Sequence, residues 1–173
     1  MDPKERCAMR IGEDGIALIK HWESFRANPY VCPAGWWTVG YGAIHGPDGL
    51  PVTRRTLPVT RLQADFMLNR DARRAAAAVN RLCPVALTPR QFDALCSFTF
   101  NLGGAALQRS SLRQCVLRGD HAAAQAEFPK WSKARDPRTG LYRALSGLLA
   151  RRVEEAALYA GAGAADTRSS KAA

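Results

Sequence analysis

The stretch GIALIKHWESFRANPYVCPAGWWTVGYGA, residues 15–43, contains a change of pattern that decides the fold class. Ile16 and Ile19 lie three residues apart and mark the apolar face of a helix. Asp14 can cap this helix, because a short acidic side chain accepts from the free N–H groups of a first turn. The helix is expected to end before Asn28, which precedes a proline. Aromatic, β-branched, glycine and proline residues then follow, so the stretch predicts a helix leading into a small antiparallel sheet.

The sequence beyond this stretch extends the same organisation. Turn residues recur between short aromatic and β-branched runs from residue 30 to about residue 60, which predicts the rest of the sheet. After Thr60 the apolar residues recur at helical spacing, and Thr88-Pro89 is a cap followed by proline at the first helical position. The expected helices lie near 60–80 and at 88–102, 110–118, 121–133 and 141–159. This order predicts an α+β fold with a small sheet lobe, a larger helical lobe and a cleft between them.

The length of 173 residues fits one domain with one active site. Charged residues without helical periodicity occupy the start of the chain, and small polar residues occupy its end. We therefore expect a flexible segment over 1–12, a folded catalytic domain over 13–160 and a flexible tail over 161–173.

The charge balance indicates a polyanionic partner. Lys and Arg number 25 against 15 Asp and Glu, which gives a formal net charge of +10 and a pI near 10.0. Nucleic acid, an anionic membrane and the bacterial wall all fit. The arginines are spread over several expected helices and form no recognisable nucleic-acid motif, which disfavours a nucleic-acid-binding module.

The cysteines and histidines give no sign of a metal site. The five cysteines are scattered, no pair has the C-x-x-C spacing, and the three histidines stand apart from them. We therefore expect no metal, no cofactor and a reduced cytosolic environment. The first fifteen residues lack the apolar core of a signal peptide, and no stretch reaches the ~20 apolar residues of a membrane span.

Glu23 is the first candidate for chemistry, because it lies four residues after Ile19 and shares its inward face. Burial beside Trp22 and Phe25 would favour the protonated acid, which can donate a proton to a leaving oxygen. The alternative is a structural glutamate that bends out to solvent or pairs with an arginine.

The residues that follow Glu23 carry a family resemblance. Eight residues separate Glu23 from Cys32 and five separate Cys32 from Thr38, and a Gly-x-Gly turn comes next. This spacing resembles that of the phage T4-type lysozymes, the endolysins of glycoside hydrolase family 24. LTPRQFDALCSFTFNLG (87–103), RSSLRQCVLRGDHAAAQAEFPKW (109–131) and the closing residues 147–159 are similar to later family motifs in the same order.

The resemblance implies a lysozyme-like fold and a lytic function. The implied reaction is hydrolysis of the β-1,4 bonds between N-acetylmuramic acid and N-acetylglucosamine in bacterial peptidoglycan, with Glu23 as general acid. The implied partners are peptidoglycan and a holin, which releases the monomeric enzyme from the host cytoplasm to the periplasm. The net positive charge adds a possible contact with the anionic outer-membrane surface. A lytic transglycosylase is the alternative enzyme, because it needs the acid and no second carboxylate.

Cys32 departs from the commoner pattern, since most members carry aspartate at this position. Glu-Cys-Thr is a variant of the family triad, so Cys32 and Thr38 are catalytic candidates beside Glu23. A thiolate is a strong nucleophile and would support a covalent route, whereas a base role would act on a water that Thr38 also holds. The third alternative is that Cys32 is a small buried packing residue.

Several other residues match positions that line the family's cleft. Arg151 matches the arginine that pairs with the acid, although a solvated Arg151-Arg152 face is the alternative. The matching substrate-binding candidates are Tyr41, Gly42, Ile44, Phe100, Asn101 and Ser111. Core packing is the alternative for Phe100 and Ile44. Trp36 and Trp37 can stack on a sugar ring, and we expect at least one of them to close the small core. The last helix can also be read as basic and membrane-active, although packing within the fold explains it better.

Overall fold

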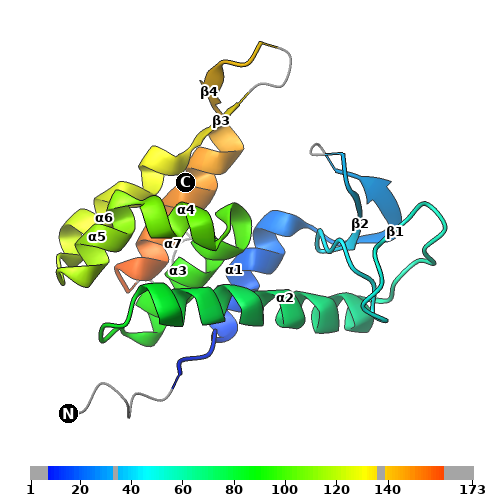
Figure 1. Ribbon diagram of the computed structural model, residues 1–173, viewed down its shortest axis with the longest axis horizontal. Coiled ribbons are helices and arrows are strands. Elements are labelled where there is room, and N and C mark those ends of the chain that lie inside the picture. The colour runs from blue at the N-terminus through cyan, green and yellow to red at the C-terminus, as the bar shows by residue number, and fades with distance from the viewer. Residues whose placement is uncertain (1–7, 33–34, 136–138, 162–173) are drawn as a thin grey trace, which may run out of the picture.

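The computed structural model describes residues 8–32, 35–135 and 139–161, whose elements form a sheet lobe and a helical lobe (Figure 1). The chain starts with α1 (Glu13–Glu23), and the strands β1 (Arg26–Val31) and β2 (Trp37–Gly40) follow it. The long helix α2 (Arg61–Leu82) runs from the sheet lobe to the helical lobe (Figure 1). The later elements are α3 (Pro89–Leu102), α4 (Gly104–Arg109), α5 (Ser111–Leu117), α6 (His121–Glu127), the 3-10 helix η2 (Phe128–Trp131), β3 (Lys133–Arg135), β4 (Tyr142–Ala144) and α7 (Ser146–Tyr159). The predicted α+β organisation is confirmed.

The sheet lobe is built on one antiparallel pair. Tyr30 pairs with Thr38 and Val31 with Trp37, and the register shifts between this end and Arg26. Isolated bridges continue the lobe beyond the strands. Its core joins the inner face of α1 to β2 and the first half of α2, and its buried members are Ile19, Val39, Tyr41, Ala43, Val52, Val59, Ala64, Met67, Leu68 and Ala72. The sheet is therefore held by one face of α2 and by α1.

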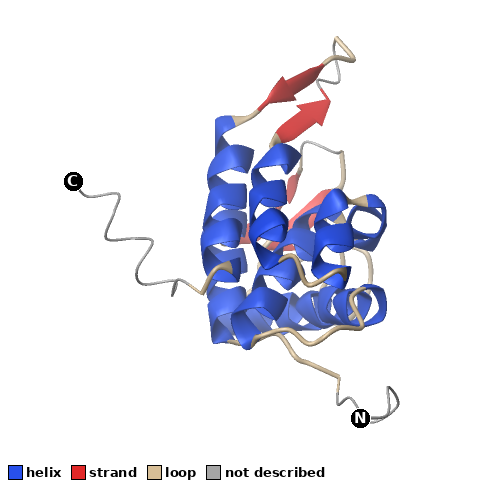
Figure 2. Cartoon of the chain, turned by 90° about the vertical axis from the view of Figure 1, so that its left-hand side faces the viewer, coloured by secondary structure: helices blue, strands red, loops and turns tan. Residues whose placement is uncertain are grey.

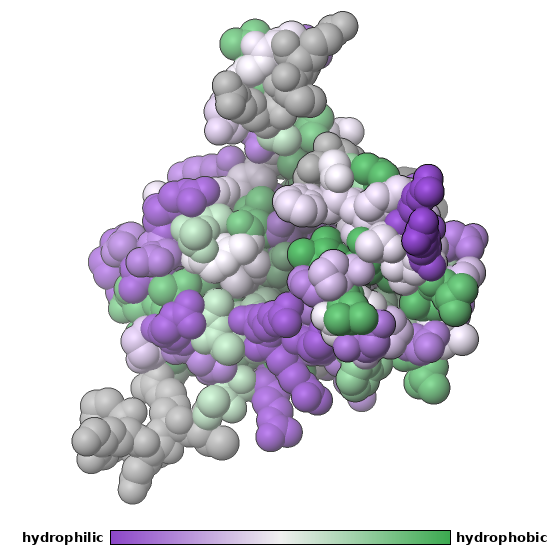
Figure 3. Space-filling view, turned by 45° about the vertical axis from the view of Figure 1, so that its right-hand side comes forward, coloured by the Kyte–Doolittle hydropathy of each residue, from purple (hydrophilic) through white to green (hydrophobic). Residues whose placement is uncertain are grey.

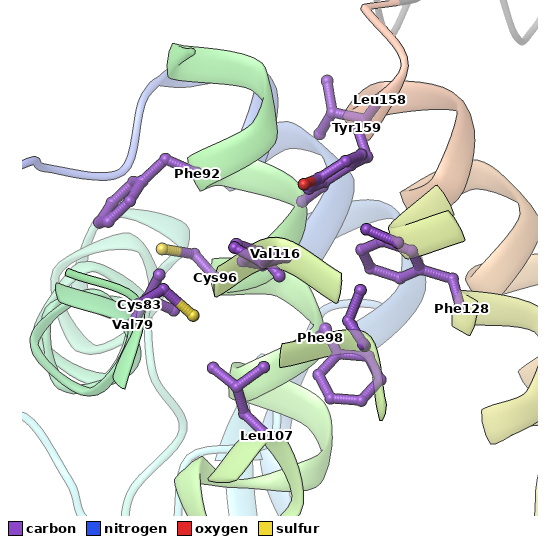
Figure 4. Packing of buried hydrophobic residues seen from close by; sticks show 14 of the residues in the cluster. Val79, Cys83, Phe92, Cys96, Phe98, Leu107, Val116, Phe128, Leu158 and Tyr159 are labelled. Carbon is purple, nitrogen blue, oxygen red and sulfur yellow. The ribbon is translucent and has the colours of Figure 1, made fainter. Parts of the chain in front are cut away.

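The helical lobe is organised around α3. The run from Phe92 to Thr99 is buried throughout, as expected for a helix surrounded by others. Phe98 meets Phe128 and Trp131 edge-on, with ring centroids 5.8 and 5.4 Å apart. Tyr159 of α7 packs on the other side of Phe128 (Figure 4). This aromatic group fixes α7 against α3, and α7 carries part of the site described below.

Two helix starts agree with the sequence. Thr60 and Thr88 each accept from the backbone N–H of the glutamine three residues on, and each glutamine accepts in return from the threonine N–H. Pro89 occupies the first turn of α3, where its missing N–H costs no hydrogen bond.

The bounds of α1 differ from the prediction. Asp14 is not its cap, because the N-cap is Gly12 without a side-chain bond. The Asp93 carboxylate of α3 instead accepts from Gly12 N at 2.7 Å and from Gly15 N at 3.1 Å. The helix ends at Glu23 and β1 begins at Arg26, so the sheet starts earlier than residue 30. Glu23 is thus the last residue of α1.

The two last predicted helices are shorter than expected. The segment 121–133 divides into α6 and η2, because Pro129 lacks the N–H that would continue an α-helix. The segment 141–159 begins with β4, which pairs with β3 in a hairpin that projects from the helical lobe (Figure 2). Neither this hairpin nor α4 was predicted.

The start of the described chain is part of the folded unit. Asn80 of α2 accepts from Met9 N at 3.1 Å and donates to Met9 O at 2.9 Å, and Ile11 packs against both cores. Residues 9–12, which belong to the segment expected to be flexible, thus make contacts with α2, α3 and both cores. Residues 1–7 with Cys7, and most of the tail expected over 161–173, lie outside the described residues. Among the described helices, none has both the length and the apolar character to cross a bilayer.

Candidate active site

Glu23 lies at the end of α1, where Ser24 turns the chain into β1 with a φ of 52°. Arg151 Nη1 of α7 donates to Glu23 Oε1 at 2.7 Å. The Glu23 side chain is 22% exposed, whereas that of Arg151 is 4% exposed. Glu23 therefore does not bend fully out to solvent, and the structure combines the two other readings, partial burial and pairing with an arginine.

Arg151 belongs to a buried cluster of charges, which we call the arginine–glutamate cluster: Glu23, Arg151, Arg152 and Glu155. Glu155 Oε1 accepts from Arg151 Nε at 3.2 Å and from Arg152 Nη2 at 3.1 Å. Both arginines are buried, so the solvated Arg151-Arg152 face is wrong. Two guanidinium groups and two carboxylates thus share the junction of α1 and α7.

The helix α3 supplies neutral partners to this cluster. Ser97 Oγ donates to Glu155 Oε1 at 2.8 Å, and Asn101 Oδ1 accepts from Arg152 Nη2 at 3.0 Å. Ser97 and Glu155 were not among the residues predicted for the site. The spacing contains a signal for Glu155, since it follows Arg151 by four residues and Arg152 by three and so shares their helix face.

Gly42 lies beside Oε2 of Glu23, the carboxylate oxygen that does not bond Arg151. A Cβ placed on Gly42 would lie 3.5 Å from Glu23 Oε2, and the φ of this residue is 79°. Thr38 on β2 is buried, and its hydroxyl donates to Tyr30 O at 3.2 Å. The Thr38 oxygen therefore remains able to accept a hydrogen bond, while its proton is engaged.

Cys32 follows directly after β1. Its N–H donates to Trp36 O at 2.9 Å, and its carbonyl accepts from Gly35 N at 2.8 Å, so both backbone polar groups of Cys32 are hydrogen-bonded. The Cys32 side chain is a free thiol of intermediate exposure, while Cys83, Cys96 and Cys115 are free and buried. Burial raises the pKa of Cys83 to about 11. Cys32 is thus the accessible thiol among these four.

The other predicted site residues divide by exposure. Tyr41 is a member of the sheet-lobe core, where its ring lies 5.7 Å from that of Phe25. Ile44 is 47% exposed, and Ser111 is an exposed residue at the start of α5. Phe100 is half-buried against the sheet-lobe core. Of the predicted site residues, Arg151 and Gly42 thus lie beside Glu23. Asn101 contacts the site only indirectly, through its hydrogen bond with Arg152.

Two further expectations concern surfaces. Trp36 and Trp37 are 65% and 36% exposed, so the expectation that at least one closes the small core is wrong.

The space-filling view shows a furrow between the two lobes (Figure 3). In the described ranges no three His, Cys, Asp or Glu side chains group as a metal site requires.

The chain matches a known protein family over most of its length. The family model described as phage lysozyme matches residues 20–155, which include Glu23, Cys32, Thr38 and the rest of the arginine–glutamate cluster. The chain belongs to the phage lysozyme family. An endolysin of Acyrthosiphon pisum secondary endosymbiont phage 1 is 40% identical over 154 residues, which cover 89% of this chain and 100% of that protein.

Solved structures agree with this membership of the phage lysozyme family. An endolysin from Escherichia coli O157:H7 phage FAHEc1 superposes with a TM-score of 0.83 at 32% identity, over 90% of this chain and 96% of that chain. The muramidase domain of SpmX from Asticaccaulis excentricus has a TM-score of 0.77 at 34% identity, over 87% of this chain and 97% of that chain. The predicted lysozyme-like fold class is confirmed, and this member of the phage lysozyme family is a glycoside hydrolase.

The position of Gly42 in this phage lysozyme leads to a prediction. Gly42→Ala is expected to lower the rate of peptidoglycan hydrolysis. The new methyl group would be in van der Waals contact with Glu23 Oε2, at 3.5 Å, and would occupy space beside the proposed acid. Gly49→Ala is the matched control, since its φ of 81° gives the same backbone strain and nothing lies within 4 Å of its added Cβ. Both variants should lose about 1–2 kcal/mol of stability. Thermal unfolding and kcat/KM of both variants check this, and equal kcat/KM values would contradict it.

Proposed function

We propose that this chain is an endolysin that hydrolyses the β-1,4 bonds between N-acetylmuramic acid and N-acetylglucosamine in bacterial peptidoglycan and so lyses the host cell. The observation that carries the proposal is the placement of Glu23, partly exposed at the end of α1, 2.7 Å from the buried Arg151 guanidinium, within a lysozyme-like fold. The proposed catalytic domain covers residues 13–160.

Glu23 acts as the general acid in this proposal. Its proton passes to the glycosidic oxygen as the bond between that oxygen and the anomeric carbon breaks, and an oxocarbenium-like centre develops on the sugar. Partial exposure lets the carboxyl reach the substrate, and the bond from Arg151 fixes its orientation. A water then supplies the hydroxyl of the new reducing end.

Cys32 and Thr38 act on the far side of the sugar in this proposal. The Cys32 thiol is partly exposed and both backbone polar groups of the residue are hydrogen-bonded, which suits either direct attack on the anomeric carbon or activation of a water. The Thr38 oxygen, whose proton is given to Tyr30 O, can accept from that water. The two routes differ in the stereochemistry of the new end.

The outer positions complete the proposed substrate site. Ile44 and Ser111 are exposed and able to touch the glycan, and Phe100 is half-buried against the sheet-lobe core. Tyr41 and Asn101 support the site from behind, through the sheet-lobe core and the Arg152 bond. Gly42 keeps the space beside the Glu23 carboxylate open.

The activity is tested on purified sacculi. The protein should solubilise them and release new reducing ends in step with the loss of turbidity. Sacculi that stay intact, with the protein folded by circular dichroism, would contradict the proposed function. Compared with the transglycosylase alternative, hydrolysis is favoured by the family and by the muramidase domain among the similar structures.

We further propose that the enzyme is a monomer that remains in the host cytoplasm until a holin opens the inner membrane. Its net charge of +10 supports attraction to the anionic envelope on the way to the wall. Expression alone should leave cells intact, and co-expression with a holin should lyse them. Prompt lysis without a holin would contradict this route.

A further inference from the structure

Glu155 lies inside the arginine–glutamate cluster, on α7. Its side chain is 0% exposed, and its Oε1 accepts from Arg151, Arg152 and Ser97. The Nε of Arg151 points to Glu155 while Nη1 of the same guanidinium points to Glu23. Glu155 therefore fixes the plane of the group that holds the acid.

The cluster is a poor way to stabilise the fold. Buried ion pairs often gain less from their attraction than they lose in hydration. Within the described part of the chain, four buried polar atoms of the cluster have no hydrogen-bond partner among the protein's own atoms: Arg151 Nη2, Arg152 Nε, Arg152 Nη1 and Glu155 Oε2. Burying polar atoms that the protein itself does not pair costs free energy, so the cluster is not explained by stability alone.

We propose that Glu155 is a positioning residue, which orients Arg151 against Glu23 and balances the two guanidinium charges so that Glu23 can keep the proton it donates. This inference rests on the proposed role of Glu23 as general acid. Without a second carboxylate, Arg151 and Arg152 would both act on Glu23 and favour its ionised form, which cannot protonate a leaving group. The carboxylate of Glu155 pairs with both guanidinium groups, and so it weakens their stabilisation of the ionised form of Glu23.

The charges around Glu155 support this balance. Arg151 and Arg152 lie on its own helix, and Glu23 of α1 lies beyond Arg151. The helix α3 contributes only the neutral Ser97 and Asn101 to these bonds. On the other elements packed against α7, His121 bonds the Tyr159 hydroxyl and Glu127 pairs with Lys130, so both are engaged elsewhere.

The ionisation of the cluster is set by the same contacts. Burial raises the pKa of Glu155, and the Arg152 and Arg151 charges and the Ser97 hydrogen bond oppose this effect. Burial lowers the pKa of Arg152 to about 10, which leaves it charged at neutral pH. Glu155 accepts hydrogen bonds from both guanidinium groups and from Ser97, and these contacts favour its ionised form.

The test is the pH dependence of kcat on purified sacculi. Glu155→Gln keeps the shape and can still accept hydrogen bonds, but it removes one negative charge. The alkaline limb of the profile, where the acid loses its proton, should move down by on the order of one pH unit. Glu154→Gln is the matched control, because it removes the same charge from the neighbouring residue, whose carboxylate accepts from Trp22 Nε1 instead. Its limb should stay near that of the parent.

Two further variants test the same balance of charges from the side of Arg152. Arg152→Met removes one positive charge at similar volume, so the alkaline limb should move up. Combining Glu155→Gln with Arg152→Met removes both charges, which buried pairs tolerate better than the loss of one partner. The limb of this double variant should return close to that of the parent. These two variants carry the test if Glu155→Gln alone does not fold.

The outcomes separate this inference from the proposed function. A purely structural Glu155 would lower kcat at every pH and leave the limb in place, and that result, or shifts of the same sign in Glu155→Gln and Arg152→Met, would overturn the inference. Full activity of Glu23→Gln would instead overturn the role of the acid, whatever the profiles of the cluster variants.

Discussion

Glu23→Gln is expected to lower the rate of peptidoglycan hydrolysis by at least ~100-fold, because an amide has no acidic proton to give to the leaving oxygen. The fold should be unchanged, since the glutamine oxygen can still accept from Arg151 Nη1, which lies 2.7 Å from Glu23 Oε1 in the parent. The measurement is kcat on purified sacculi, with circular dichroism and thermal unfolding as checks of the fold.

The control for this substitution is available on the same helix. Glu13 is exposed in the first turn of α1, so Glu13→Gln makes the same chemical change at the opposite end of the helix from Glu23. It should keep the activity of the parent. Activity of Glu23→Gln close to that of the parent would contradict the assignment of the acid.

Cys32→Ala is expected to lower kcat by at least ~10-fold, because the variant lacks the nucleophile or base that the proposed mechanism assigns to Cys32. Cys32→Ser should lose most of the activity as well, since a hydroxyl is a far weaker nucleophile than a thiolate. Cys32→Asp should retain or raise it, because a carboxylate is ionised at neutral pH without help from the site. Steady-state rates on sacculi check all three.

Chemical labelling gives an independent check on Cys32. A thiol reagent should inactivate the parent, and a bound chitooligosaccharide should protect it. The Cys32→Asp variant is the control, because it keeps the buried Cys83, Cys96 and Cys115 and should resist the reagent. Nearly full activity of Cys32→Ala would show that the thiol only packs, and catalysis by Glu23 alone would then be favoured.

Local pattern was enough to predict the elements that carry the candidate acid. The spacing of Ile16, Ile19 and Glu23 fixes one helix face, and α1 has that face against the sheet-lobe core. The start of α3 was equally predictable, because the threonine and glutamine of its capping box and the proline of its first turn lie within four residues of sequence.

Several of the errors come from contacts between residues far apart in sequence, and others from elements with no apolar pattern of their own. The carboxylate at the start of α1 comes from Asp93, which is 81 residues from Gly12. The strand β4 is exposed along its length and so has no apolar alternation to reveal it. Arg151 and Arg152 look like a solvated pair until Glu155 and α3 enclose them.

The central claim is that the chain breaks the glycosidic bond by adding water, and its most direct test is mass spectrometry of sacculi digested in oxygen-18 water. Hydrolysis predicts muropeptides with a reducing end that carries one atom of oxygen-18 from the solvent. A lytic transglycosylase would instead leave a 1,6-anhydro end with no solvent oxygen. Unlabelled anhydro products from the parent enzyme would contradict the account, and labelled reducing ends that disappear in Glu23→Gln would agree with it.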